Sequence, residues 1–210
     1  MNAREALARL RRLGIPVIHT ADAAAALGLS KTAATMTLSR LLEVGLVSSV
    51  RHGLWWVDGA VDPYRLPEYL TAPLESYLSL HTALHLRGLI EQIPEIFYAV
   101  TLGRTQRALT RAGTFSLHHV APEVFGGFEE TDAGIKLATA EKALFDVAYL
   151  SAGRSRLFAT LPELELPRGF RQSELRRWIH RIPSARSRTL TERRVAAFLK
   201  GARAADGTAR

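Results

Sequence analysis

The stretch GLSKTAATMTLSRLLEVGLVSSVRHGLWWV, residues 28–57, decides how the first part of the chain folds. Ser30 has the side chain of a helix N-cap, and Gly45 is the residue type that most often follows a helix end. We therefore predict a helix over Lys31–Val44. Four apolar positions of this helix share one face, as expected for a side buried in a core: Ala34, Leu38, Leu41 and Leu42.

A β-hairpin is predicted directly after this helix. Its strands are Leu46–Val50 and Leu54–Val57, and Gly53 allows the positive φ that a tight turn requires. The preceding segments are predicted to be a helix over Arg4–Leu13 ended by Gly14 and Pro16, an extended link over Ile15–His19, and a helix to Leu27 with Thr20 as its N-cap.

Helix, helix, turn, helix and hairpin within about 57 residues is the order of a winged helix-turn-helix. The third helix is the one that enters the major groove in such domains, and short polar side chains let it approach the bases closely. The predicted DNA-binding residues lie on its outer face and at the hairpin tip: Lys31, Thr32, Thr35, Met36, Ser39, Arg40, Arg51 and His52. Winged helices also serve as protein-interaction modules, so the fold alone does not fix this function.

Charge is distributed unevenly along the 210 residues, whose net charge is +8. Residues 1–60 carry a net charge of +3, residues 61–150 of −4, and residues 151–210 of +9. Basic segments attract polyanions and accelerate association with them. With no cysteine, no apolar run long enough to cross a bilayer and no secretory-signal layout at the N-terminus, we expect a cytoplasmic protein without disulfides and without membrane contact.

The rest of the chain predicts a second, mixed α/β part that begins after a proline-containing linker. The expected elements are helices over Ser76–Leu89, Thr139–Leu150, Leu157–Thr160, Gln172–His180 and Thr191–Ala202, and strands over Ile96–Thr101, Thr114–Val120, Phe128–Thr131 and Ile135–Ala138. The predicted fold class is therefore α+β, with a winged helix-turn-helix in residues 1–60, a mixed α/β domain in 61–203 that ends in a basic helical part from about 151, and disorder in 204–210.

Three motifs in this second part occur in an order that resembles the AbiEi family of antitoxins. They are YLSLHTALHLRGLIEQIP (77–94), VAPEVFGG (120–127, within a matching stretch from Phe115) and ATAEKALFD (138–146). The hairpin sequence VRHGLW (50–55) is also similar to the end of that family's N-terminal domain. The resemblance extends over roughly residues 20–150 and does not include the basic stretch from Arg154 onward.

The resemblance implies an antitoxin of a type IV, abortive-infection toxin–antitoxin system, active in phage defence. Such a protein binds inverted repeats in its own promoter, represses the operon, and counteracts a nucleotidyltransferase-like toxin, with or without direct contact. Paired repeats favour two or more copies on DNA, although winged helices also bind as separate monomers. The alternative is a plain winged-helix regulator whose second domain binds a ligand or a protein, with no toxin.

No enzymatic activity, metal or cofactor is expected. His81 and His85 have the i, i+4 spacing of metal ligands on a helix, but no third ligand is evident, and Thr82 stands where a zinc protease has its catalytic glutamate. His118 and His119 alternate along a strand, so one should be packed and the other exposed. Gly126 and Gly127 lack the lysine of a phosphate-binding loop and are expected to form a turn.

Two interpretations of the basic C-terminal part stay open. Its arginines could form a solvated face that offsets the acidic middle segment. Alternatively, they could add phosphate contacts that strengthen DNA binding without reading sequence. The candidates for such contacts are Arg171, Arg176, Arg177, Arg181, Arg186 and Arg188, with Arg193 and Arg194 nearby.

Overall fold

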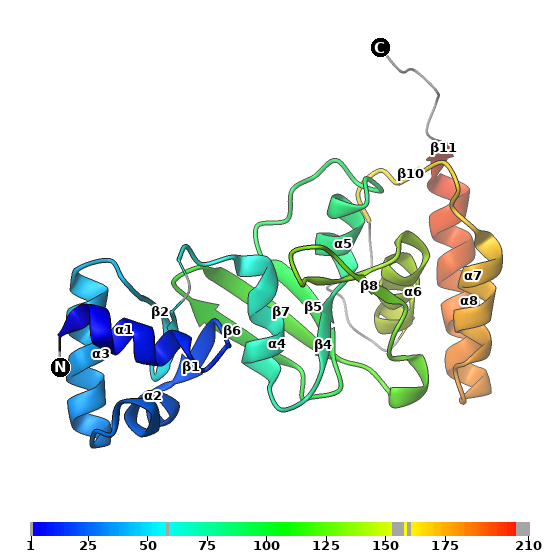
Figure 1. The fold of residues 1–210 in the computed structure, drawn as a ribbon. Helices are drawn as coiled ribbons and strands as arrows, with labels where there is room; N and C mark the ends of the chain where they lie inside the picture. The colour runs from blue at the N-terminus through cyan, green and yellow to red at the C-terminus, as the bar shows by residue number, and fades with distance from the viewer. Residues whose placement is uncertain (1, 58, 153–157, 159–160, 205–210) are drawn as a thin grey trace, which may run out of the picture. The chain divides into compact units, whose positions relative to one another are not determined.

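The computed structural model describes residues 2–57, 59–152, 158 and 161–204, and it contains both helices and sheets (Figure 1). The α+β class predicted from the sequence is therefore confirmed. The chain divides into two compact units: Met1–Pro63 with Leu109–Gly113, and Tyr64–Ala108 with Thr114–Arg210.

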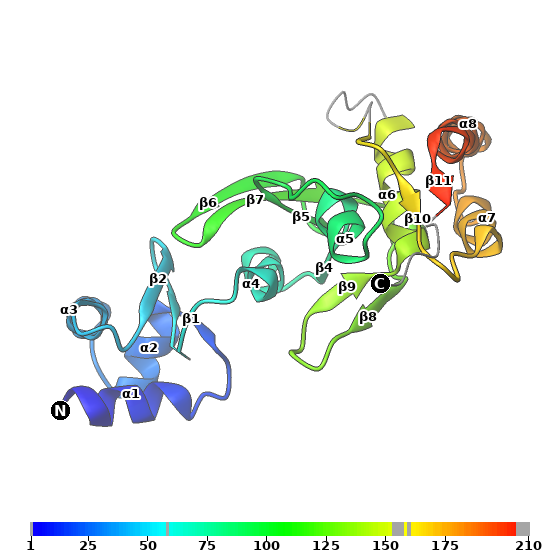
Figure 2. The same ribbon diagram turned by 90° about the horizontal axis from the view of Figure 1, so that it is seen from above.

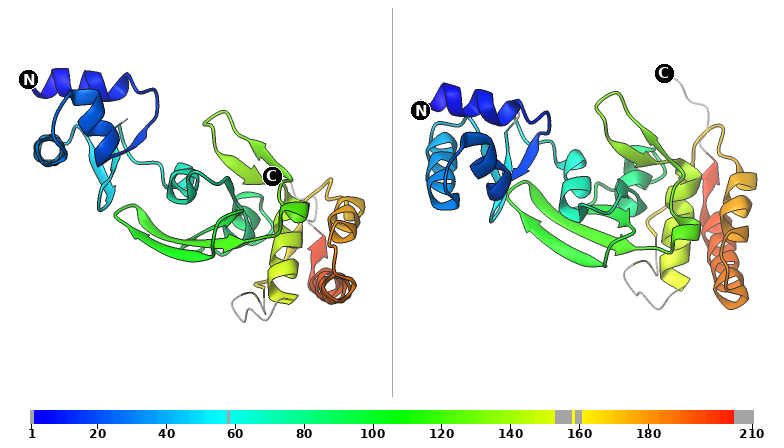
Figure 3. Two further views of the ribbon diagram at one scale, coloured as in Figure 1. Left: turned by 90° about the horizontal axis from the view of Figure 1, so that it is seen from below. Right: turned by 60° about the horizontal axis from the view of Figure 1, so that its bottom comes forward.

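Three helices and a three-stranded antiparallel sheet form the first unit. In chain order they are α1 (Ala3–Arg11), β1 (Val17–His19), α2 (Thr20–Leu27), α3 (Lys31–Glu43), β2 (Ser48–Arg51) and β3 (Leu54–Trp56). The strand order is β1-β3-β2, so β3 pairs on both sides. Figure 2 and the left view of Figure 3 look along the axis of α3, with α1 and α2 beside it.

The start of α2 differs from the prediction. The N-cap is His19, whose backbone N–H donates to the Asp22 carboxylate at 2.9 Å, and the helix begins at Thr20. The prediction of Thr20 as N-cap was wrong because β1 runs directly into the helix, which leaves His19 as the extended residue. The Thr20 hydroxyl is instead buried, and it accepts a hydrogen bond from Trp55 Nε1 at 2.9 Å.

A six-stranded mixed sheet runs through the second unit, in the strand order β6-β7-β5-β4-β9-β8. Its strands are β4 (Ser76–Leu78), β5 (Phe97–Thr101), β6 (Gln106–Thr110), β7 (Gly113–His119), β8 (Phe128–Glu130) and β9 (Lys136–Ala138). The predicted strands over β5, β7, β8 and β9 are confirmed within one or two residues. Strand β6 was not predicted, because its alternation is interrupted by the polar run Arg104–Arg107.

The predicted helix over Ser76–Leu89 is wrong in its first half. Ser76–Leu78 is strand β4, which pairs with β5 and β9, and the helix α5 covers only Leu80–Leu86. A short apolar run is compatible with either a buried strand or a buried helix, so periodicity could not separate them. The change of direction falls at Leu80, which is fully buried and has a φ of 54°.

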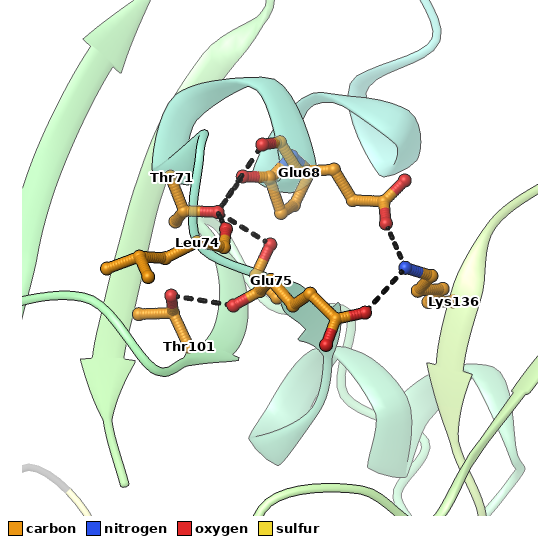
Figure 4. Close-up of polar contacts among 8 residues, drawn as sticks. Glu68, Thr71, Leu74, Glu75, Thr101 and Lys136 are labelled. Carbon is orange, nitrogen blue, oxygen red and sulfur yellow. Dashed lines mark hydrogen bonds and ion pairs between the residues drawn. The ribbon is translucent and has the colours of Figure 1, made fainter. Parts of the chain in front are cut away.

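The segment before β4 is held by polar contacts around one turn (Figure 4). It follows η1 (Pro63–Arg65) and α4 (Leu66–Thr71). The buried Thr71 hydroxyl lies 2.9 Å from Leu74 O and 3.0 Å from Ser76 Oγ, and Thr101 Oγ1 donates to Glu75 O at 2.9 Å. Lys136 Nζ bridges the Glu68 and Glu75 carboxylates at 2.7 and 3.4 Å, which ties β9 to both ends of the turn.

Helix α6 (Ala140–Ala152) forms the centre of a helical layer with α7 (Gln172–His180) and α8 (Ala185–Gly201). Figures 1 and 2 show these three helices gathered side by side at the end of the unit away from β6. The prediction for α7 matches its bounds, and Thr139 Oγ1 accepts the Lys142 N–H at 3.2 Å, as expected of a helix cap. Helix α8 begins six residues before the predicted Thr191, because Ser184 caps it.

A buried ionic cluster joins α6 to the sheet. Lys142 and Asp146 have fully buried side chains one helical turn apart, and they form an ion pair. Asp146 Oδ2 also accepts hydrogen bonds from Tyr77 in β4 at 3.1 Å and from Ser79, the residue after β4, at 2.7 Å. Burial lowers the pKa of Lys142 and raises the pKa of Asp146, while the charge of each partner opposes the shift of the other.

Helix α7 closes this cluster from outside. The Trp178 ring centroid lies 4.8 Å from Lys142 Nζ, and the Phe145 ring lies at the same distance. A Cβ on Gly127 would stand 2.5 Å from the Trp178 ring and 2.9 Å from Lys142 Cγ. Gly127 therefore has two roles: its φ of 73° forms the turn, and its lack of a side chain lets the turn lie close to Trp178 and Lys142.

The last described residues form a small parallel pairing, with β10 (Glu165–Leu166) beside β11 (Arg203–Ala204). The prediction of disorder is wrong at Ala204 for this reason, and its remaining part, 205–210, lies outside the described residues. The helix predicted over Leu157–Thr160 also falls outside them, except for Phe158. Across the ranges that the structure describes, no helix combines the length and the apolar character that crossing a membrane would require.

Candidate nucleic-acid interface

Helix α3 presents the candidate interface, and its sequence explains both of its faces. Ser30 Oγ accepts the Ala33 N–H at 3.2 Å, so the predicted N-cap is confirmed. The side chains of Ala34, Leu38 and Leu41 are fully buried, and Leu42 packs partly against the same core. Because this stripe fixes how the helix is rotated, the opposite face must be exposed.

The predicted residues on α3 lie together on that outer face. Lys31, Thr32, Thr35 and Arg40 are exposed, and Ser39 is partly exposed. Met36 is 55% exposed, so it too can contact a partner on this face. The Thr35 hydroxyl donates to Lys31 O at 2.9 Å, so its oxygen is left as an acceptor for groups outside the helix.

The electrostatics of this face favour an anionic partner. No carboxylate occurs in the sequence between Asp22 and Glu43, a span that includes the positive N-terminal end of α3. Within the described ranges, neither Lys31 nor Arg40 takes part in an ion pair. Both cations are therefore available to neutralise phosphates.

The β2–β3 hairpin carries the other two predicted residues. Arg51 is partly exposed, His52 is exposed, and Gly53 adopts the predicted positive φ of 74°. The hairpin is anchored to the start of α2, because Gly53 O accepts the Thr20 N–H at 3.0 Å in addition to the Trp55–Thr20 bond. Sequence reasoning missed this role of Thr20, since a bond across 35 residues leaves no local pattern.

The candidate phosphate contacts in the basic C-terminal part differ in how far they are engaged. Arg188 donates to Ile182 O at 2.8 Å and 3.2 Å, Arg181 lies over the Trp178 ring, and Arg177 pairs with Glu174 at 3.1 Å. These arginines have structural contacts of their own. Arg171, Arg176 and Arg186 are exposed, as is Arg193, whereas Arg194 is partly exposed.

The histidine pairs hold no metal site that the structure can support. Among the described residues, no group of three or more His, Asp or Glu side chains has the arrangement to bind an ion. His118 is buried and His119 exposed, as predicted for neighbours on a strand. His118 hydrogen-bonds with Ser116 at 2.8 Å, and burial lowers its pKa to about 4, so it is uncharged at neutral pH.

A pocket in the second unit was not foreseen from the sequence. It has a volume of about 610 Å³ and is lined in part by His81, Gln92, Tyr98 and Arg107. These residues come from α5, the loop after it, β5 and β6. Because they are separated in sequence and β6 was not predicted, no motif could have indicated the pocket.

No protein-family model matches this chain, and no curated protein matches it either.

Proposed function

We propose that the protein represses its own operon by binding double-stranded DNA, and that its first unit is a winged helix-turn-helix whose α3 enters the major groove. The observation that carries the proposal is the outer face of α3. It combines short polar side chains with two cations, Lys31 and Arg40, that form no ion pair among the described residues, and no carboxylate occurs in residues 23–42. Such a face allows a close approach to base edges and neutralises phosphates.

The further part of the proposal follows the family resemblance. The second unit, which carries the three motifs, counteracts a nucleotidyltransferase-like toxin, and the protein acts by binding rather than by catalysis. Two of the motifs meet around Asp146, which is bonded to Tyr77 and Ser79 of the first motif and paired with Lys142 of the third. This contact supports the interpretation that the motifs preserve one packed domain.

The DNA-binding part is tested with the promoter region of the protein's own gene and a scrambled duplex of equal length, over a salt series. We expect selective binding whose affinity falls steeply with salt. The double variant Lys31→Ala/Arg40→Ala should bind roughly tenfold or more weakly and lose about two units of salt slope. Arg4→Ala removes an exposed cation of α1 in the same unit and serves as the control.

Equal loss in Arg4→Ala and in the double variant would show only a general attraction to charge and would contradict the proposed face. Changes at Thr32 or Met36 should instead alter sequence preference with little effect on the salt slope. If the preference stays unchanged, α3 is not the helix that reads the bases.

The antitoxin part is tested by co-expression with a nucleotidyltransferase-like protein encoded by an adjacent gene. We expect the full chain to restore growth, and the Lys31→Ala/Arg40→Ala variant to restore it as well, since toxin control is assigned to the second unit. Failure to restore growth, with DNA binding intact, would favour a plain regulator whose second unit binds a ligand or a protein. The 610 Å³ pocket is the observation in favour of that second candidate.

A further inference from the structure

The pocket in the second unit has the size of a small-molecule site. Its volume of about 610 Å³ lies within the range of about 300 to 1,000 Å³ that is typical of ligand sites. That space is much larger than a single phosphate or acetate ion would fill. Its lining therefore decides which class of molecule could occupy it.

Two neighbouring rings, whose planes are tilted by 44° to each other, give one part of this lining an aromatic character. The His81 and Tyr98 centroids lie 5.3 Å apart, and Phe158 packs against both rings at 5.7 and 5.9 Å. Burial lowers the pKa of His81, so the imidazole is uncharged at neutral pH. A neutral imidazole next to a phenol ring offers a surface on which a planar ligand can stack.

The backbone and the hydrogen bonding at His81 are both unusual. His81 Nδ1 is buried and has no hydrogen-bond partner within the part of the chain that the structure describes. Leu80 directly before it adopts a φ of 54°, a region that branched side chains strongly disfavour. Strained backbone is concentrated at binding and active sites, where the fold holds a side chain in place for a ligand.

An unpaired cation adds a charge to the pocket. Arg107 on β6 is exposed, and no carboxylate of the described residues forms an ion pair with it. It lines the pocket together with Tyr98, and its positive charge opposes the effect of burial on the pKa of the Tyr98 hydroxyl. An arginine fork beside a phenol O–H is well suited to a phosphate or carboxylate group.

We propose that this pocket binds a small planar anion of the nucleotide class. The ring stacks on Tyr98 and packs at an angle against His81, and the phosphate pairs with Arg107. Gln92 and Glu95, which also line the pocket, supply the amide and carboxylate groups that recognise the polar edge of a base. This inference is independent of the DNA-binding proposal, because every residue that it uses belongs to the second unit.

The test is calorimetric titration of the full chain with AMP, GMP, CMP and UMP in turn. We expect at least one of them to bind with a Kd below about 1 mM. The corresponding nucleoside and inorganic phosphate should each bind at least about tenfold more weakly, since each lacks one half of the recognised group. Arg107→Gln should weaken nucleotide binding about tenfold, as expected for loss of a charge-assisted contact.

Arg104→Gln is the matched control, because Arg104 is an exposed cation three residues away that does not line the pocket. DNA binding by the Arg107→Gln variant is measured in parallel, so that failure of this proposal is distinguished from failure of the other. No nucleotide binding up to about 5 mM would overturn the inference. Binding of phosphate alone as tight as any nucleotide, or an equal loss in both arginine variants, would overturn it too.

Discussion

The two units differ in what they bury, and the difference shows how each one is held together. In the first unit, Thr20 is the one buried polar side chain among the described residues, and the remaining core is apolar. The second unit buries His118, Glu141, Lys142 and Asp146 as well as its apolar core. Ionisable groups that are removed from water must be paired, hydrogen-bonded or neutralised.

The consequence is a difference in what each fold depends on. The first unit depends on the volume and the pattern of its apolar residues, which tolerate many conservative exchanges. In the second unit, specific partners must be present: Arg171 N–H donates to the Glu141 carboxylate at 2.8 Å, and Asp146 accepts from three side chains, those of Tyr77, Ser79 and Lys142. We therefore expect the second unit to be more sensitive to single polar substitutions and to pH.

Asp146→Ala is expected to have the largest effect on stability. It leaves the Lys142 ammonium, the Tyr77 hydroxyl and the Ser79 hydroxyl buried without their common acceptor. Breaking a buried pair in this way costs about 3–5 kcal/mol of unfolding free energy. Urea denaturation measures the loss, and hydrogen exchange should locate it in α6 rather than in α3.

Lys142→Met is the matched comparison for this prediction. Methionine keeps most of the volume under Trp178, and Asp146 keeps its bonds to Tyr77 and Ser79. The loss of stability should be clearly smaller than for Asp146→Ala. Equal losses would mean that the ion pair, rather than the shared acceptor, determines the stability of the cluster.

The second-largest effect that we expect is a loss of stability of the second unit in mild acid. The pKa of His118 is about 4 in the folded protein and about 6.5 when unfolded, so between these values the unfolded state binds more protons. Stability is therefore fully present above about pH 6.5 and falls as the pH is lowered toward 4. His118 alone accounts for about 2 kcal/mol between pH 7 and pH 5, and His81 acts in the same direction.

Thermal unfolding of the wild type and of His118→Gln across this pH range tests whether stability falls in acid and whether His118 causes the fall. Glutamine is neutral throughout and can retain a hydrogen bond to Ser116, which is the hydrogen-bond partner of His118. The variant should show a shallower dependence on pH than the wild type. An unchanged dependence would assign the acid sensitivity to other groups, of which His81 is the first candidate, because burial lowers its pKa as well.

Thr20→Val probes a buried polar contact of the first unit, the bond between Thr20 and Trp55. The substitution preserves shape but leaves Trp55 Nε1 without its acceptor, which costs about 1–3 kcal/mol. Since the same residue anchors the hairpin that carries Arg51 and His52, promoter binding should also weaken. Thr37→Val is the control, because the Thr37 hydroxyl bonds only within its own helix, to Ala33 O at 2.9 Å. If both variants behave alike, the hairpin does not depend on the Trp55–Thr20 bond.

The same contrast explains how much of the molecule could be predicted from its sequence. In the first unit, helix caps and the spacing of apolar residues predicted the bounds of α3 and of the β2–β3 hairpin within one or two residues. This was possible because the contacts that define these elements are short-range or follow the helical period. The eight residues proposed for DNA binding lie on the outer face and at the tip for the same reason: a helix that buries Ala34, Leu38 and Leu41 must expose the opposite side.

In the second unit, the elements that were mispredicted are those defined by distant partners. Tyr77 and Leu78 belong to a strand only because β5 and β9 lie on either side of them. The Lys142–Asp146 spacing is visible as an i, i+4 pair, but such pairs are normally exposed, and only the meeting of Tyr77, Ser79 and Trp178 around them makes this one buried. The pocket depends on four such segments and had no local signature.

The smallest effect expected concerns the exposed arginines of α7 and α8. The segment 168–203 holds eleven Arg and Lys residues against two Glu, yet deleting it would uncover Lys142, which Trp178 covers.

Arg176→Gln/Arg186→Gln is the better test, because both side chains are exposed, and stability should change by less than about 0.5 kcal/mol. If these arginines contact phosphates, the salt slope of promoter binding falls by about two units while sequence preference is unchanged. Arg188→Gln is expected to behave differently, since its guanidinium caps Ile182 O and its loss should destabilise the α7–α8 turn. An unchanged slope in the double variant would leave the basic tail as a solvated face and place all of the promoter contacts in the first unit.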